Sequence, residues 1–187
     1  QDSTSGLAED SSGTTTWTPS VAIAENATGW WRVRAADPHV AGVWTDLEGY
    51  FVNETNEAPQ APEPLAPLEG DSVASITPQL SWTEGTDVDQ DALTYDIEVV
   101  DGTNTLVTST TGLTDLTWTV DTDLTEDAWY SWEVRSVDPD GLTSDWIAGQ
   151  AFFVDVTNSP PADVTWVTPT DGDDLVDLAP LLEVNDT

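Results

Sequence analysis

Residues 130–134 read Tyr130-Ser-Trp132-Glu-Val134, with large apolar side chains at every second position. A period of two is typical of a β-strand with one face buried and the other in water. The same alternation recurs in residues 78–82, 93–99 and 116–120, between turn-forming clusters of Asp, Gly and Thr. The chain therefore predicts an all-β fold of short antiparallel strands around one core. The side chains expected to face this core are Leu80, Trp82, Tyr95, Ile97, Trp118, Tyr130, Trp132 and Val134.

The sequence around this strand occurs twice in the chain. Residues 31–34 (Trp-Arg-Val-Arg) match residues 132–135 (Trp-Glu-Val-Arg) at a spacing of 101 residues. After one extra residue the matches continue at a spacing of 102, as in residues 51–52 and 153–154 (both Phe-Val). A repeat of domain size indicates a string of modules that each have their own core. The expected units are the C-terminal part of one module (1–57), a complete module (58–157) and the first strands of a further module (158–187).

Four motifs of the complete module together carry a family resemblance. They are Pro78-x-Leu80-x-Trp82, Asp87-x-Asp89-x-Asp91-x-Leu93-Thr-Tyr95, Leu124-x5-Tyr130-x-Trp132-x-Val134, and Asp138-x-x-Gly141 followed by Trp146. With these motifs the module resembles a fibronectin type III domain of the kind found in tandem arrays on large prokaryotic surface and secreted proteins. The resemblance implies an immunoglobulin-like β-sandwich of about seven antiparallel strands, in which Leu124 and Tyr130 form the tyrosine corner. In the first repeat Gly29 has the position of the corner tyrosine, so we expect Trp30 or Trp31 to compensate.

The chain is strongly acidic. It has 36 Asp and Glu residues, three Arg and no Lys, which gives a formal net charge of −33 at pH 7. Such a charge repels phosphate backbones and anionic surfaces, which excludes nucleic acid as a partner. No stretch approaches the roughly 20 apolar residues of a membrane-spanning helix, so we expect no direct membrane insertion of this segment. The self-repulsion favours a salty or calcium-rich, extracellular or cell-surface location, with a general adaptation for solubility as the alternative.

Residues 87–91 (Asp-Val-Asp-Gln-Asp) form the sharpest local motif. Carboxylates at alternate positions of a turn can converge on one hard cation, because Ca²⁺ takes six to eight oxygen ligands at about 2.3–2.6 Å. In a fold of the fibronectin kind, the linker from the preceding module and the loop that carries Asp138 and Asp140 reach the same end, an arrangement similar to the calcium-stiffened junctions of cadherins. The competing interpretation is ordinary turn chemistry of an acidic protein. The predicted Ca²⁺ ligands are Asp87, Asp89, Asp91, Asp138 and Asp140.

The remaining candidate sites involve tryptophan and asparagine. Most of the ten Trp residues occupy inward positions of the strand pattern, which favours a core role over carbohydrate stacking. Trp129 and Trp166 are exceptions, because neither has a Trp at the matching repeat position. Three Asn-x-Ser/Thr sequons would be glycosylation sites in a host that uses them. They begin at Asn26, Asn53 and Asn185.

Catalytic chemistry has few residues to use. The chain has a single His (His39) and no Lys or Cys, and we expect its acidic clusters in short exposed turns, without the apolar pocket that a raised carboxyl pKa requires. We therefore expect a non-enzymatic extracellular structural or adhesive repeat protein: a stalk, adhesin or filament building block. Its partners would be neighbouring modules or copies of itself, and cell-surface or polysaccharide ligands. The alternative is a spacer or carbohydrate-binding accessory module of a secreted polysaccharide-degrading enzyme.

Overall fold

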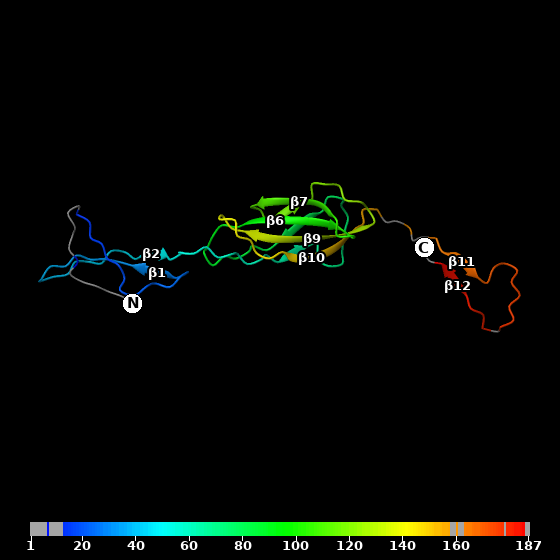
Figure 1. Ribbon diagram of the computed structural model, residues 1–187, viewed down its shortest axis with the longest axis horizontal. Helices are drawn as coiled ribbons and strands as arrows, with labels where there is room; N and C mark the ends of the chain where they lie inside the picture. The colour runs from blue at the N-terminus through cyan, green and yellow to red at the C-terminus, as the bar shows by residue number, and fades with distance from the viewer. Residues whose placement is uncertain (1–6, 8–12, 158–159, 161–162, 178, 186–187) are drawn as a thin grey trace.

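The computed structural model describes residues 7, 13–157, 160, 163–177 and 179–185 (Figure 1). These residues contain no helix, and hence none with the length and apolar character needed to cross a membrane. They form twelve strands: β1 (Thr28–Trp31), β2 (Glu48–Phe51), β3 (Pro64–Ala66), β4 (Asp71–Val73), β5 (Gln79–Trp82), β6 (Thr94–Asp101), β7 (Leu106–Leu113), β8 (Thr117–Thr119), β9 (Ala128–Val137), β10 (Ile147–Val154), β11 (Thr165–Thr168) and β12 (Glu183–Asn185). The predicted all-β fold is confirmed.

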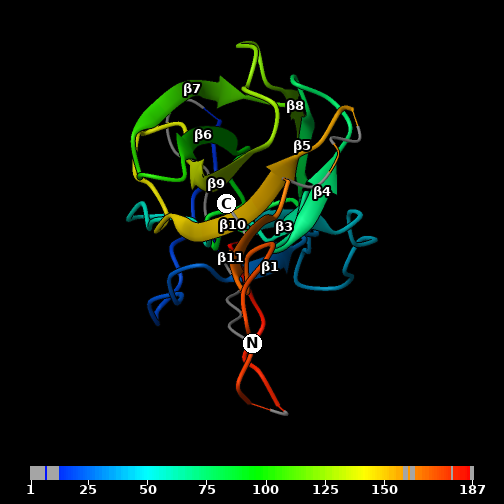
Figure 2. The same cartoon turned by 90° about the vertical axis from the view of Figure 1, so that its right-hand side faces the viewer.

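The central part of the chain is built from two sheets. One has five strands in the order β4-β10-β9-β6-β7, and the other has three in the order β3-β5-β8. Figure 2 looks along the strands, with β6 and β9 on one side of the core and β5 and β8 on the other. Buried side chains of both sheets form one apolar cluster, so the arrangement fits a β-sandwich. At either side of this unit lies a two-stranded sheet, β1-β2 before it and β11-β12 after it (Figure 1).

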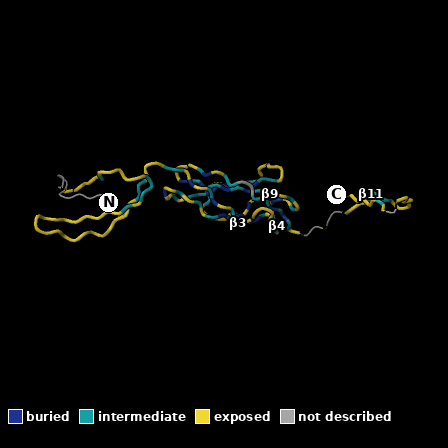
Figure 3. Tube along the Cα trace, turned by 90° about the horizontal axis from the view of Figure 1, so that it is seen from below, coloured by how far each residue is buried: buried dark blue, intermediate teal, exposed yellow. Residues whose placement is uncertain are grey.

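The core follows the alternation of the sequence. Of the eight side chains predicted to face it, seven are buried and Trp118 is partly buried against them. The ring of Trp82 contacts Trp132 at a centroid distance of 6.4 Å and Tyr95 edge-on at 5.6 Å. The indole of Trp132 also donates a hydrogen bond of 2.9 Å to the carbonyl of Pro67. Buried residues are concentrated in this central unit, whereas the tube toward both ends is mostly exposed (Figure 3).

The strand count differs from the seven antiparallel strands that the family resemblance implies. Residues 58–157 hold eight strands, because the first edge segment is divided into β3, which pairs antiparallel with β5, and β4, which pairs parallel with β10. The break has a local cause. Pro67 has no N–H for the β3 ladder, and the N–H of Leu68 donates to the Asp71 carboxylate at 2.7 Å. Gly70, at a φ of +86°, completes the turn that moves the chain to the other sheet.

The corner before β9 has the hydrogen bond expected of a tyrosine corner. The hydroxyl of Tyr130 accepts from the backbone N–H of Thr125 at 2.8 Å, and its ring stacks on Phe152. The first repeat differs from our expectation that Trp30 or Trp31 replaces this tyrosine. Both of these Trp side chains are more than half exposed, and the ring of Tyr50 instead covers Gly29, where a Cβ would come within 2.3 Å of it. The expectation was wrong because the compensating ring belongs to the neighbouring strand β2.

The repeat of the sequence is also a repeat of strand register. Thr28 of β1 pairs with Phe51 of β2. Trp129 of β9 and Phe153 of β10, at offsets of 101 and 102, form the same pair. Likewise, β11 pairs with β12 in the register of the β3–β5 pair, moved by 102 residues. The two terminal hairpins therefore reproduce the last and the first antiparallel strand pairs of the central unit.

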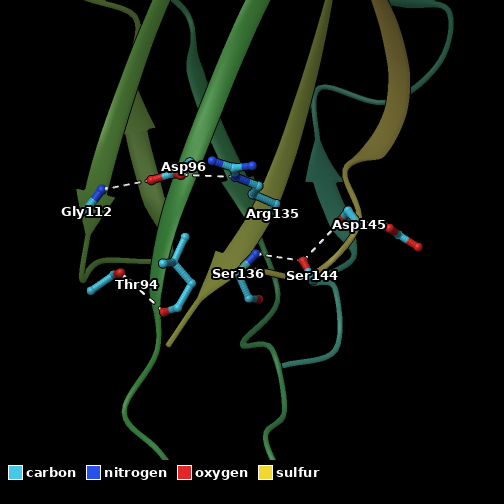
Figure 4. A network of polar contacts seen from close by, with 8 residues as sticks. Thr94, Asp96, Gly112, Arg135, Ser136, Ser144 and Asp145 are labelled. Carbon is cyan, nitrogen blue, oxygen red and sulfur yellow. Dashed lines mark hydrogen bonds and ion pairs between the residues drawn. The ribbon is translucent and has the colours of Figure 1, made fainter. Parts of the chain in front are cut away.

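A polar network crosses the outer face of the five-stranded sheet (Figure 4). Arg135 of β9 forms a 2.9 Å ion pair with Asp96 of β6, and Asp96 also accepts from the backbone N–H of Gly112 at 3.2 Å. The guanidinium of Arg135 lies over the ring of Trp146 at 4.6 Å. One repeat earlier, Arg34 lies over the matching ring at 4.5 Å. The network thus joins β6, β7 and β9, and its Arg–Trp contact is repeated along the chain.

Candidate cation site at the acidic junction

The loop between β5 and β6 brings the predicted motif together. Asp87 closes a tight turn, because its Oδ1 accepts from the backbone N–H of Asp89 at 2.7 Å. Gln90 has a φ of +65°, which folds the loop back on itself. One carboxylate oxygen from each of Asp87, Asp89 and Asp91 lies within 4.8 Å of the others. The alternate carboxylates therefore converge, as a shared hard cation requires.

Asp138 and Asp140 lie beside this group but outside it. Asp138 is 4% exposed and is occupied by hydrogen bonds: Oδ2 accepts from the Asn56 amide at 2.7 Å and Oδ1 from the N–H of Leu142 at 2.8 Å. Burial acts to raise the pKa of Asp138, but these donors outweigh it and lower the pKa. Asp140 is exposed. Both carboxylates act on Asp91, whose pKa is raised by burial and then by the charges of Asp87, Asp138 and Asp140.

A second acidic group overlaps the first at Asp89. It consists of Glu25, Glu57 and Asp89, again with one oxygen of each within 4.8 Å of the others. The linker positions it, since the backbone N–H of Glu57 donates to Asp89 Oδ2 at 2.7 Å. Glu25 lies in the loop before β1. Its Oε1 accepts from the backbone N–H of Glu54, in the linker after β2, at 2.7 Å. We call the region formed by residues 25–26, 53–57 and 83–93 the acidic junction.

Among the described residues, no basic side chain pairs with a carboxylate of the acidic junction. The one ion pair in the described part of the chain is Arg135–Asp96, on the sheet. The backbone N–H of Glu57 acts to lower the pKa of Asp89, but burial, the Glu57 carboxyl and the charge of Asp87 together raise it. Hydrogen bonds from the Asn26 amide and the Thr55 hydroxyl lower the pKa of Glu57. Negative charges are therefore crowded here with only neutral donors to offset them.

Two buried oxygens of the acidic junction lack a donor. Asp87 Oδ2 and Asn26 Oδ1 are buried atoms with no hydrogen-bond partner. The Asn53 amide is different: with its nitrogen turned toward the linker, it donates to the carbonyl of Thr55 at 3.0 Å and to Asp89 Oδ1 at 3.2 Å. Buried oxygens without donors are costly, and a hard cation removes that cost.

Sequence reasoning did not place Glu25 at the cation site and named Asn26 only as a glycosylation site, although the repeat contains a signal for this loop. Glu126, 101 residues after Glu25, belongs to a third acidic group with Asp127 and Asp155. Glu126 accepts from the backbone N–H and hydroxyl of Thr157, much as Glu25 accepts from the N–H of Thr55. Asn26 and Asp127 share a φ of +56°. The loop that carries Glu25 is thus a repeated structure.

The other candidate sites have simple surroundings. The amide nitrogen of Asn26, where a glycan would attach, donates to Glu57 at 3.1 Å, whereas Asn53 and Asn185 are exposed. Trp129 is 49% exposed and packs against Phe153 at a centroid distance of 5.3 Å, on the outer face of the sheet. The side chain of Trp166 lies outside the described residues.

Comparison with protein-family models and with curated proteins gave no match. The class of protein must therefore be argued from the fold and from the acidic junction.

Proposed function

We propose that this chain is part of a tandem array of fibronectin type III-like modules with a structural role outside the cell, as a stalk, adhesin or filament building block. The observation that carries the proposal is the repeated strand register, in which β1-β2 reproduces β9-β10 and β11-β12 reproduces β3-β5. The hydrogen bond from Thr125 to Tyr130 supports the family of the module. The single imidazole, His39, is exposed, which agrees with a non-enzymatic role.

In this proposal Ca²⁺ binds Asp87, Asp89 and Asp91 and stiffens the acidic junction. The fit is chemical: three converging carboxylates, one of them with a buried oxygen that no donor reaches, form a hard, anionic oxygen site. Asp138 supports the site indirectly, because its carboxylate accepts a hydrogen bond from Asn56 and so holds the linker against the module. Asp140 supports it through its negative charge near Asp91. A net charge of −33 agrees with an environment rich in cations, such as a cell surface.

The second candidate function is a carbohydrate-binding accessory module, and one observation favours it. Trp129, which is 49% exposed, and the partly buried Phe153 form an aromatic pair on a sheet face, a surface on which sugar rings could stack. Most other exposed Trp side chains lie on the partial module before the linker, and Trp17, Trp31 and Trp44 among them match core or network positions of the central unit. The pair is small, so the structural role remains the preferred proposal.

Two measurements on the 187-residue chain separate these functions. In small-angle scattering, the maximum dimension of the chain should be larger, and its radius of gyration less variable, in millimolar CaCl₂ than in NaCl of equal ionic strength. Equal distributions in the two salts would refute stiffening by calcium. Co-sedimentation with insoluble polysaccharides should leave the protein in solution. Retention that is lost in Trp129→Ala, but not in the exposed control Trp30→Ala, would establish the accessory module instead.

A further inference from the structure

We infer that the carboxylate of Glu25 is a conformational latch, which fixes the direction of the linker after β2 by hydrogen bonds and without a bound ion. Glu25 lies before β1, and its Oε1 accepts from the backbone N–H groups of Glu54 at 2.7 Å and Thr55 at 3.2 Å. Hydrogen bonds to an ionised acceptor are stronger than neutral ones, so one carboxylate restrains two successive peptide units. We call this contact the Glu25 latch. It does not depend on the proposed Ca²⁺ site.

The same contact recurs one repeat later with a different side chain at one of its positions. Glu126 accepts from the backbone N–H of Thr157, and backbone hydrogen bonds from Thr157 and Val156 lower its pKa. Val156 and Thr157 follow Glu54 and Thr55 at the repeat spacing of 102 residues. Because Val replaces Glu at the first of these positions, the contact is made by the backbone. The contact therefore belongs to the repeat and not to the conformation of a single loop.

The loop that carries each glutamate is fixed to the end of the strand that leads into the linker. The backbone N–H of Asn26 donates to the carbonyl of Val52 at 2.9 Å, and that of Asp127 donates to the carbonyl of Val154 at 2.9 Å. Asn26 and Asp127 also share a φ of +56°, so the two turns have the same shape at this residue. The glutamate is thus positioned by a backbone turn before it contacts the linker.

The linker has no unrestrained residue while the latch is closed. Residues 54–55 are held by the latch, and the next two residues are held by the central unit. The side-chain amide of Asn56 donates to Asp138 Oδ2 at 2.7 Å, and the backbone N–H of Glu57 donates to Asp89 Oδ2 at 2.7 Å. Opening the latch would free the φ and ψ angles of residues 54–55, which are the soft dihedrals of the chain. The latch therefore decides whether the linker is a rigid connection or a hinge.

Electrostatic repulsion acts against the latch. One oxygen of Glu25 lies within 4.8 Å of an oxygen of Glu57 and of Asp89, and no basic side chain pairs with these groups in the described residues. Hydrogen bonds close the latch and repulsion opens it, so its balance should depend on salt, which screens charges at a surface. A cation at the neighbouring loop would act in the same direction as salt. Glu25→Gln removes the charge and keeps an accepting oxygen, so this variant should stay closed at low salt.

The test is the width of the distance distribution between two spin labels across the linker, measured by double electron–electron resonance in EDTA. The chain has no Cys, so Glu48→Cys in β2 and Ser109→Cys in β7, both at exposed positions, can be labelled specifically. The distribution should contain a narrow component from the closed latch, which grows as NaCl is added. Glu25→Ala should raise the ratio of broad to narrow component about tenfold, since a hydrogen bond to a charged group contributes roughly this factor. Glu25→Gln should retain the narrow component.

Glu126→Ala is the matched control, because it removes the same contact and the same charge at the other linker. It should leave the distance distribution unchanged. Amide hydrogen exchange followed by NMR gives a local readout of both latches. Exchange at Glu54 and Thr55 should be faster in Glu25→Ala only, and exchange at Thr157 should be faster in Glu126→Ala only. If Glu25→Ala did not fold, the salt dependence of Glu25→Gln against the unsubstituted chain would still test the latch.

The outcomes separate the latch from the proposed Ca²⁺ site. A narrow component that is present in EDTA, lost in Glu25→Ala and retained in Glu25→Gln would support the latch, whether or not CaCl₂ increases it further. A narrow distribution in EDTA that Glu25→Ala leaves unchanged would refute the latch and assign the fixed direction to Asn56 and Glu57. A distribution that is broad in EDTA at every NaCl concentration and narrow only in CaCl₂ would refute the latch and leave the Ca²⁺ site intact.

Discussion

Tyr130→Phe is expected to destabilise the central unit by removing a single hydroxyl. That hydroxyl accepts the backbone N–H of Thr125 at 2.8 Å, and the ring, which stacks on Phe152, would remain in place. An unpaired buried donor costs about 1–3 kcal/mol, and because Thr125 is exposed enough for water to reach, the lower part of this range applies. We therefore expect a loss of about 1–1.5 kcal/mol, which for a domain near 100 residues lowers the melting temperature by about 5–10 °C.

The assay is thermal and urea unfolding followed by near-ultraviolet circular dichroism, which reports the immobilised core rings of Trp82 and Trp132 rather than the exposed indoles. Tyr50→Phe is the matched control, because Tyr50 is 36% exposed and lies on the hairpin before the linker. It should change the transition of the central unit by less than about 0.3 kcal/mol. If Tyr130→Phe were as mild as this control, the corner hydrogen bond would not contribute to stability, and the reasoning would be refuted.

Three other outcomes are expected. Trp132→Ala should lower the free energy of unfolding in urea by about 3–5 kcal/mol, because it empties the centre of the core. The control Trp129→Ala should lower it by less than about 1 kcal/mol, and equal losses would contradict the burial pattern. Glu98 and Glu133 are directly paired across β6 and β9, and burial together with the Glu98 charge raises the pKa of Glu133. The folded state then holds this proton more tightly than the unfolded state, so the contribution of Glu133 to stability should increase as pH falls toward its raised pKa. Glu133→Gln should add about 0.2–1 kcal/mol at neutral pH, and its advantage over the unsubstituted protein should shrink as pH falls in pH-resolved denaturation. Ca²⁺ at a hundredfold excess over Kd should stabilise the chain by about 2.7 kcal/mol in a thermal scan, and NaCl of equal ionic strength should stabilise it by less. Asp91→Asn should lose the extra stabilisation by Ca²⁺ over NaCl. If NaCl reproduced the whole effect, no specific site would exist.

The core was predictable because it depends on local alternation. Trp82, Ile97 and Val134 fall on the inward face of their strands whatever the partner strand is. The two adjacent rings of Phe152 and Phe153 do not alternate with polar residues, so the sequence alone left their orientation open. Register decides it: Phe152 pairs with Tyr130 and is fully buried, and Phe153 packs against Trp129, at a tilt, on the outer face.

Features that depend on contacts between distant segments of the chain were harder to predict from the sequence. The parallel pairing of β4 with β10 joins residues about 80 positions apart, and no short-range pattern specifies which sheet edge will receive β4. At the acidic junction, the convergence of Asp87, Asp89 and Asp91 could be expected from a five-residue motif. The approach of Glu25 could not, since it is 64 residues from Asp89 and belongs to no motif, although its repeat partner Glu126 has the same kind of contact.

The Arg–Trp contacts have a consequence for many chains side by side. All three positively charged side chains of the protein are held over its own indole rings: Arg32 and Arg34 over Trp44, and Arg135 over Trp146. A guanidinium over an indole keeps its charge, but only three Arg stand against 36 acidic residues, so adjacent chains repel each other. Their repulsion extends over the Debye length, about 30 Å at 0.01 M salt and about 3 Å at 1 M. Chains of this kind attached side by side to a surface would behave as a polyelectrolyte brush. The distance between neighbouring chains would be large in fresh water and small in brine.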